Sequence, residues 1–150
     1  MPRGAVVREP LRRAAESATG VRAEFRTDAT AITLPVRVTG TPRPMIDVLA
    51  DGELVHRRQL GEGLNEVATP LSGAPADVEV WLPQDGRVSV GDLTLTGAGI
   101  VDIGRPARRR WYAYGSSITH CLAAAGPSQT WPSMVARRNG WDLTCLGFNG

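Results

Sequence analysis

The sequence predicts a mixed fold: an all-β sandwich or jelly roll over residues 21–103, followed by the first βαβ unit of an α/β domain over residues 110–150. In the first range, short runs of alternating apolar and polar residues are separated by turn residues about every ten positions, a pattern typical of β-sandwiches. Residues 104–109 combine glycine, proline and arginine without apolar periodicity, which predicts a linker. After this linker the pattern changes to strand, helix, strand. Residues 1–20 form an N-terminal segment that we expect to be poorly ordered.

The first predicted strand alternates apolar and charged residues between positions 21 and 26. Successive side chains of a strand point to opposite faces of its sheet. Val21, Ala23 and Phe25 are therefore predicted to face the interior, and Arg22 and Glu24 to face solvent.

Two further strand predictions rest on proline and on a turn dipeptide. Pro35 interrupts the alternating run 34–38 and has no amide hydrogen to give to a ladder, so this strand is predicted to be peripheral or bulged. The Asp51-Gly52 dipeptide readily takes the positive φ angles of a two-residue hairpin turn, which predicts a hairpin between the runs 45–50 and 53–60. More short strands are predicted at residues 78–82, 88–90, 93–95 and around Ile100.

A strand–helix–strand unit is predicted beyond the linker. The run 111–114 is consistent with a buried parallel strand, and the run 141–146 with the strand that follows. Thr130 can cap a helix between them, and Asn139-Gly140 stops that helix. The apolar face of the helix is predicted from three residues, Trp131, Met134 and Val135.

Composition excludes several classes of protein. The formal net charge is only +2, with 17 basic and 15 acidic residues, so no general field would hold a nucleic acid. No run approaches the roughly 18 apolar residues of a membrane span, and a cytoplasmic location is the simplest expectation. Cys121 and Cys145 are too few for a disulfide framework and are expected to be reduced thiols. No spacing of ligands predicts a metal site, and we expect no cofactor.

The sharpest functional feature is the segment Tyr114-Gly115-Ser116-Ser117-Ile118-Thr119, where a strand ends and a helical turn would begin. A serine at this point presents its hydroxyl at the carboxyl edge of a parallel sheet, where ligands bind in open α/β folds. Its own backbone N–H can face the oxyanion that forms when a carbonyl is attacked. The segment therefore predicts a nucleophilic serine.

These residues resemble the first block of the SGNH or GDSL hydrolases, a Gly-Asp-Ser-Leu-like turn after the first strand of a flavodoxin-like α/β domain. The resemblance implies that Ser117 is the nucleophile and that its N–H belongs to the oxyanion hole; Ser116 stands at the family's aspartate position and lines the pocket. The family's second block is a glycine after the second strand, which implies that Gly150 is another oxyanion donor. The β-rich first part further resembles a bacterial subgroup in which a jelly-roll domain precedes the SGNH domain.

The resemblance also implies that the chain is truncated after this second block. Serine catalysis of ester cleavage needs a base and normally a carboxylate that orients it. The family supplies both from a late Asp-x-x-His block, which has no match before Gly150. His120 is close to Ser117 and is expected to line the pocket and touch substrate, with a role as the base kept as an alternative. His56 is expected to be a surface residue of a strand.

Several functional hypotheses stay open at the level of sequence. The first is an ester hydrolase acting on a small acyl ester or an acylated carbohydrate, and an acyltransferase with the same acyl-serine intermediate is its alternative. The second is a carbohydrate-binding β module, with Trp81 either as a stacking platform or packed inside. An anion-binding turn in a nucleotide-binding unit and an α/β-hydrolase are weaker readings, because no P-loop and no G-x-S-x-G is present. The oligomeric state is left open.

Overall fold

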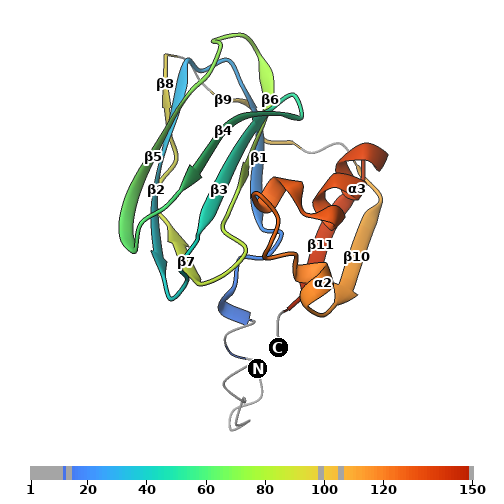
Figure 1. Ribbon diagram of the computed structural model, residues 1–150. Helices are drawn as coiled ribbons and strands as arrows, with labels where there is room; N and C mark the ends of the chain where they lie inside the picture. Colours follow the sequence, from blue (N-terminus) through green and yellow to red (C-terminus); the bar gives the residue numbers. More distant parts are fainter. Residues whose placement is uncertain (1–11, 13–14, 98–99, 105–106, 149–150) are drawn as a thin grey trace, which may run out of the picture.

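The computed structural model describes residues 12, 15–97, 100–104 and 107–148, and most of their regular structure is strand (Figure 1). The strands are β1 (Arg22–Thr27), β2 (Ala31–Thr39), β3 (Met45–Ala50), β4 (Glu53–Gln59), β5 (Gly63–Pro70), β6 (Ala76–Trp81), β7 (Arg87–Val90), β8 (Thr94–Thr96), β9 (Ile100–Asp102), β10 (Arg110–Gly115) and β11 (Asp142–Gly147). The helical segments are α2 (Ser117–His120), the 3₁₀ turn η1 (Pro127–Gln129) and α3 (Trp131–Asn139).

Two antiparallel sheets enclose the larger hydrophobic core. One sheet has the strand order β4-β3-β6-β1-β9, and the other has the order β5-β2-β7 with β8 also paired to β2. Because the apolar residues of both sheets alternate along their strands, one face of each sheet meets the other. The buried residues of this core are Phe25, Ile32, Leu34, Val36, Val38, Ile46, Val48, Leu60, Val67, Val78 and Val80. The mainly β character of the chain thus agrees with the sequence, whereas jelly-roll connectivity stays a prediction.

The Asp51-Gly52 hairpin forms as predicted. Asp51 and Gly52 have φ angles of 50° and 82°, and β3 pairs with β4 directly across this turn. Both angles lie in the left-handed region that a two-residue hairpin loop of this twist requires.

The prediction that Pro35 marks a peripheral strand is wrong. Strand β2 pairs with β5 along most of its length and with β7 and β8 on its other side. The Pro35 carbonyl accepts a hydrogen bond of 2.9 Å from the Gly91 amide, just past the end of β7. In an antiparallel strand, the backbone N and O of one residue point to the same neighbouring strand. The Pro35 nitrogen, which carries no hydrogen, therefore also faces Gly91. The β2–β7 ladder loses one hydrogen bond, at its end.

The predicted faces of β1 are correct for Phe25 and wrong for its neighbours. Phe25 is buried, but Ala23 is exposed, and the side chains of Arg22 and Glu24 are only 6% and 8% exposed. Arg22 donates a hydrogen bond of 3.1 Å to the Asp142 carboxylate at the start of β11. The charged face of β1 is therefore covered by the segment that follows the sandwich, which periodicity within β1 alone could not reveal.

That following segment has the predicted strand–helix–strand order. Strands β10 and β11 are parallel and in register from Arg110 opposite Asp142 to Gly115 opposite Gly147. The expectation that β10 is buried holds for one face only, because Tyr112 and Tyr114 are 59% and 86% exposed. A flavodoxin-like continuation of this pair stays a prediction, as do the boundaries assigned to the two parts of the chain.

Helix α3 begins and ends where the sequence predicts, but its buried face differs. The Thr130 side chain accepts a bond from the Ser133 amide, and Gly140 closes the other end in the left-handed conformation. Trp131 and Met134 were predicted to be inside, yet they are 42% and 37% exposed. The buried residues of the helix are Pro132, Ser133 and Ala136. Small side chains on this face allow α3 to approach the sheet beneath it.

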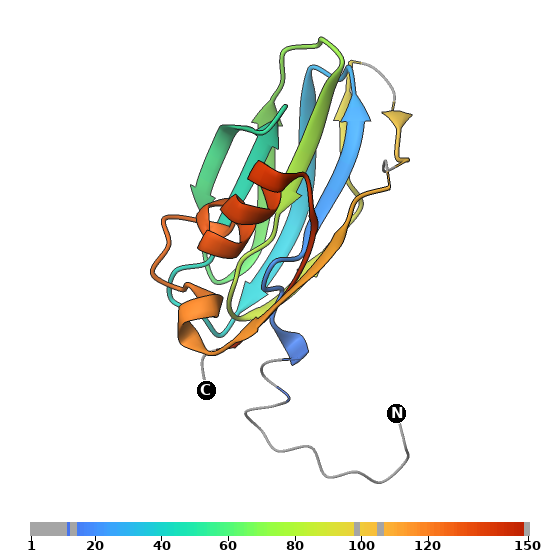
Figure 2. The same ribbon diagram turned by 90° about the vertical axis from the view of Figure 1, so that its right-hand side faces the viewer.

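The strand–helix–strand segment packs on the outer face of the five-stranded sheet, as the two views show (Figures 1 and 2). Neighbouring residues of β3 and β6 divide between the two cores: Val48 and Val80 point into the sandwich, while Leu49 and Trp81 point outward. The buried residues of this second core are Leu49, Trp81, Ala113, Ala136, Leu143 and Cys145. The sandwich therefore supplies part of the core on which the serine-bearing segment rests.

Candidate active site

The predicted nucleophile lies just past the carboxyl end of β10. Ser117 is the first residue of α2 and Ser116 its N-cap, and both are exposed. The Ser117 hydroxyl makes no hydrogen bond to another described residue, and its backbone N–H has no acceptor among them. Among the described residues, the Ser117 hydroxyl is thus open to a base and its N–H is open to an oxyanion, at the edge of a parallel strand pair.

Two glycines bring the ends of β10 and β11 against the α2 turn. A Cβ at Gly115 would lie 2.2 Å from the Thr119 hydroxyl oxygen. A Cβ at Gly147 would lie 2.6 Å from both the His120 amide nitrogen and the Thr119 carbonyl carbon. Backbone atoms cannot yield as a flexible side chain can, so Gly147 is needed for this close approach. Sequence reasoning did not reveal that Gly147 packs under the nucleophile turn.

The second oxyanion donor expected from the sequence, Gly150, lies outside the described residues. The strand that leads to it is described up to Gly147, followed by Phe148. The Phe148 amide donates a hydrogen bond of 3.2 Å to the Gly115 carbonyl, which joins the carboxyl ends of the two parallel strands. The role of Gly150 stays a prediction.

His120 is buried and bonded to the sandwich. It is 4% exposed, and its Nε2 lies 2.7 Å from the Gln84 carbonyl oxygen and 3.0 Å from the Thr19 hydroxyl. Because a carbonyl can only accept, we assign a proton to Nε2. That nitrogen is therefore a donor to Gln84 and does not serve as the base for Ser117. Contact of His120 with substrate stays a prediction that this burial does not favour.

The other histidine, His56, is half-buried on β4, where the sequence suggested a surface strand residue. Its Nδ1 lies 2.7 Å from the hydroxyl of Thr69, a fully buried residue of β5. His56 thus links the two sheets of the sandwich and is bonded away from the nucleophile turn.

A buried carboxylate anchors the loop between α2 and α3. Asp47 on β3 is 0% exposed and accepts hydrogen bonds from the Ser128 amide and hydroxyl at 3.0 and 2.6 Å. The Arg57 guanidinium pairs with the same carboxylate, and this hydrogen-bonded pairing raises the pKa of Arg57. Gly126 passes so close that a Cβ there would lie 2.5 Å from the Asp47 carboxylate. Sequence reasoning missed this anchor, because its members are scattered along the chain.

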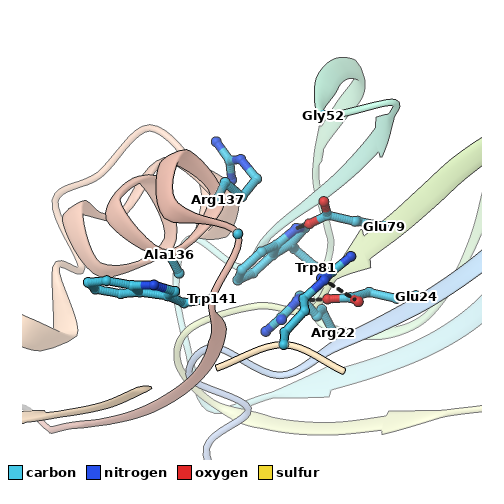
Figure 3. Close-up of a pocket in the computed structure, with 10 residues that line it drawn as sticks. Arg22, Glu24, Gly52, Glu79, Trp81, Ala136, Arg137 and Trp141 are labelled. Atoms are coloured by element: carbon cyan, nitrogen blue, oxygen red, sulfur yellow. Dashed lines mark hydrogen bonds and ion pairs between the residues drawn. The ribbon is translucent and has the colours of Figure 1, made fainter. Parts of the chain in front are cut away.

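A crevice of about 190 Å³ lies at the opposite end of the parallel strands from Ser117. Figure 3 shows Trp81 at its floor, between the guanidinium groups of Arg22 and Arg137, whose carbons lie 4.8 and 6.0 Å from the indole centroid. Its charged groups have partners within the chain: Glu24 binds both Arg22 and Arg108, Arg137 donates to the Ser128 carbonyl, and Glu79 accepts from the Trp81 indole. We therefore assign this crevice to the seam between the two parts of the chain and not to the site of chemistry.

Trp81 is packed inside rather than offered to a ligand. It is 1% exposed, and its indole N–H donates a bond of 2.7 Å to the Glu79 carboxylate. Of the two readings open in the sequence, the stacking platform is wrong and the packed residue is correct, because α3 and β11 cover this face of the sheet.

The thiols and the remaining groups add no second candidate centre. Cys121 and Cys145 are both free, as expected. Burial raises the pKa of the Cys145 thiol, and the nearby Cys121 acts in the same direction. The described residues hold no group of three or more His, Cys, Asp or Glu side chains that could bind a metal ion. Among the helices of the described chain, none has both the length and the apolar character needed to cross a membrane.

No model of a known protein family matches the sequence, and no curated protein matches it. Several solved structures, however, are similar to this chain. The chain is similar to salicylyl-acyltransferase SsfX3 from a tetracycline biosynthetic pathway, with 29% identity, a TM-score of 0.81, and coverage of 90% of this chain and 41% of the other. It is also similar to a Bacteroides ovatus protein designated a GDSL-like lipase, with 18% identity, a TM-score of 0.82, and coverage of 95% and 47%.

A third similar structure is a family two carbohydrate esterase from Clostridium thermocellum in complex with cellohexaose, with 14% identity, a TM-score of 0.71, and coverage of 85% and 44%. The described residues thus have an SGNH/GDSL hydrolase-like fold. The chain spans less than half the length of each of these three proteins.

Proposed function

We propose that this chain is the N-terminal part of a serine ester hydrolase in which Ser117 forms an acyl-serine intermediate. The observation that carries the proposal is the exposed Ser117 at the carboxyl edge of β10 and β11, with its hydroxyl and backbone N–H free of described partners. In this reaction the Ser117 oxygen attacks the ester carbonyl, its proton passes to a base, and the alcohol leaves. Water then attacks the acyl-serine and releases the acid.

The base and its orienting carboxylate would come from chain beyond these 150 residues. Both histidines are bonded to the sandwich: Nδ1 of His56 lies 2.7 Å from the Thr69 hydroxyl, and the buried His120 donates from Nε2 to the Gln84 carbonyl. The exposed apolar face of the parallel strands supports a further segment packing there; its members are Tyr112, Tyr114 and Leu146. The proposed substrate is a small acyl ester or an acylated carbohydrate, because similar structures include carbohydrate esterases. A cytoplasmic location is kept as part of the proposal.

The nucleophile can be tested by covalent labelling. The complete enzyme is incubated with a fluorophosphonate, and the adduct is located by mass spectrometry. We expect the adduct on Ser117, its loss in Ser117→Ala, and its persistence in Ser116→Ala, the neighbouring exposed serine that serves as a matched control. An adduct on another residue, or one that survives Ser117→Ala, contradicts the proposal.

An acyltransferase is the second candidate, because the similar structure of highest identity reported above is an acyltransferase. The two activities share the acyl-serine and differ in whether water or another hydroxyl accepts the acyl group. Product analysis after mixing the acylated enzyme with candidate alcohols separates them: transfer that outcompetes hydrolysis indicates the acyltransferase.

A further inference from the structure

The nucleophile turn is too short to fix its own shape. Helix α2 has only four residues, and two helical bonds close its turn: the His120 amide donates to the Ser116 carbonyl at 3.0 Å, and the Cys121 amide to the Ser117 carbonyl at 2.9 Å. A single turn is unfavourable by itself, because several dihedral angles are fixed for each hydrogen bond gained. The position of Ser117 must therefore depend on partners outside α2.

The side chain of Gln84 supplies such a partner from the sandwich. Its amide nitrogen donates hydrogen bonds to the His120 carbonyl at 2.8 Å and to the Cys121 carbonyl at 3.1 Å. The carbonyls at the end of a helix lack partners within the helix; the Cys121 carbonyl also accepts a bond of 2.9 Å from the Ala124 amide. Gln84 is 8% exposed, so water competes little for these bonds.

The Gln84 backbone is itself held in place. Its carbonyl accepts hydrogen bonds from the hydroxyls of Ser17 and Thr19, both at 2.8 Å, and lies 2.7 Å from Nε2 of His120. Gln84 and His120 thus bond to each other in both directions, side chain to backbone. Buried networks in which each member is satisfied are rigid.

We propose that Gln84 is a positioning residue for Ser117: the sandwich fixes the nucleophile turn through the Gln84 side chain. This inference rests on the proposed function. Ser117 and the two carbonyls bound by Gln84 belong to the same turn, so loss of the amide frees the end of the turn and shifts the serine hydroxyl. Gln84 acts through the turn and not by contact with the reacting atoms. Its loss should therefore lower kcat and leave KM nearly unchanged.

The test uses Gln84→Met in the complete enzyme, which keeps the length of the side chain and removes both donors. Fluorophosphonate titration counts the competent active sites, and kcat is expressed per titrated site. We expect kcat to fall about 10- to 100-fold, as for a misplacement of about 1 Å, while KM stays close to that of the unaltered enzyme. Gln59→Met, on the exposed end of β4, is the matched control and should leave both constants unchanged.

The outcomes separate the inference from the proposed function. Folded Gln84→Met enzyme with an unchanged kcat, or with a loss confined to KM, overturns the positioning role. If Gln84→Met does not fold, Thr19→Val is the second test, because it removes one hydroxyl from the same network at nearly constant shape. A lower kcat per titrated site in Thr19→Val supports the inference, and an unchanged kcat overturns it. Activity that survives Ser117→Ala instead overturns the proposed function.

Discussion

Asp47 and Arg57 form a two-point ion pair beneath the loop that follows the nucleophile turn. The Nε–Oδ1 and Nη2–Oδ2 distances are 2.7 and 2.9 Å, and Asp47 is completely buried. The Ser128 hydroxyl and amide complete the shell of the carboxylate. A buried charge with this many donors is stable only as a set, since each partner compensates for the water that the carboxylate has lost.

Replacement of Asp47 by alanine should therefore be costly. Asp47→Ala leaves the Arg57 guanidinium and the Ser128 donors without their acceptor, and we expect a loss of about 3–5 kcal/mol in the free energy of unfolding. Urea denaturation followed by circular dichroism measures it. Arg26→Ala is the control, because the Arg26–Asp77 pair is exposed and should contribute at most about 1 kcal/mol. Equal losses of unfolding free energy in the two variants would show that the buried pair contributes no more to stability than the exposed pair.

The contact of Gly147 with the nucleophile turn makes a second prediction. Gly147→Ala places a methyl group against the backbone of Thr119 and His120, so either β11 or the turn must move. We expect a loss of about 1–3 kcal/mol, as for other overpacked positions. Gly61→Ala is the matched control: its nearest neighbour would be 3.7 Å away, and the change should stay within about 0.5 kcal/mol. Thermal unfolding of both variants tests the contrast, and equal stability would contradict it.

Local signals in the sequence predicted those elements that local physics determines. The Asp51-Gly52 turn and the Thr130 cap formed as expected, because the preferred angles of a turn and the bond of a cap involve only neighbouring residues. The position of Ser117 at the end of a strand followed in the same way from the order strand, glycine, serine.

The failed predictions share a different cause, which is contact between distant parts of the chain. Arg22 looked like a solvated residue until Asp142, 120 positions later, was found beside it. The sequence left both readings of Trp81 open, because nothing in its own strand decides between them; the packing of α3 and β11 on this face decides for the buried residue. Gln84 carries no local pattern at all, and its importance for the nucleophile turn depends on tertiary structure.

The two thiols should differ in reactivity. Cys145 is buried and its pKa is raised mainly by that burial, whereas Cys121 is half-buried. Because the thiolate is the reactive form, alkylation by iodoacetamide at neutral pH should reach Cys121 first and Cys145 only on unfolding. Peptide mass spectrometry after timed quenching gives both rates, and equal rates in the folded protein would contradict the assignment.

The raised pKa of Cys145 also predicts how stability depends on pH. The folded state keeps this thiol protonated at pH values where the unfolded chain has begun to lose the proton. The stabilisation is thus complete below the ordinary thiol pKa and is lost as the pH rises above it. Unfolding free energies should fall more steeply above about pH 9 in the parent protein than in Cys145→Ala. Parallel curves for the two proteins would show that Cys145 does not contribute.

The burial of Trp81 allows a structural role to be separated from sugar binding by experiment. In Trp81→Phe the Glu79 carboxylate loses the indole donor at 2.7 Å, and we expect a loss of about 1–3 kcal/mol in the free energy of unfolding. Tyr112→Phe, on the exposed face of β10, is the control and should change stability by no more than about 0.5 kcal/mol. Calorimetric titration with cello-oligosaccharides is run on the same proteins. Any heat of sugar binding should be the same in Trp81→Phe and the parent, since a residue that is 1% exposed cannot stack on a ligand. Loss of that heat in a folded Trp81→Phe protein would restore the stacking role.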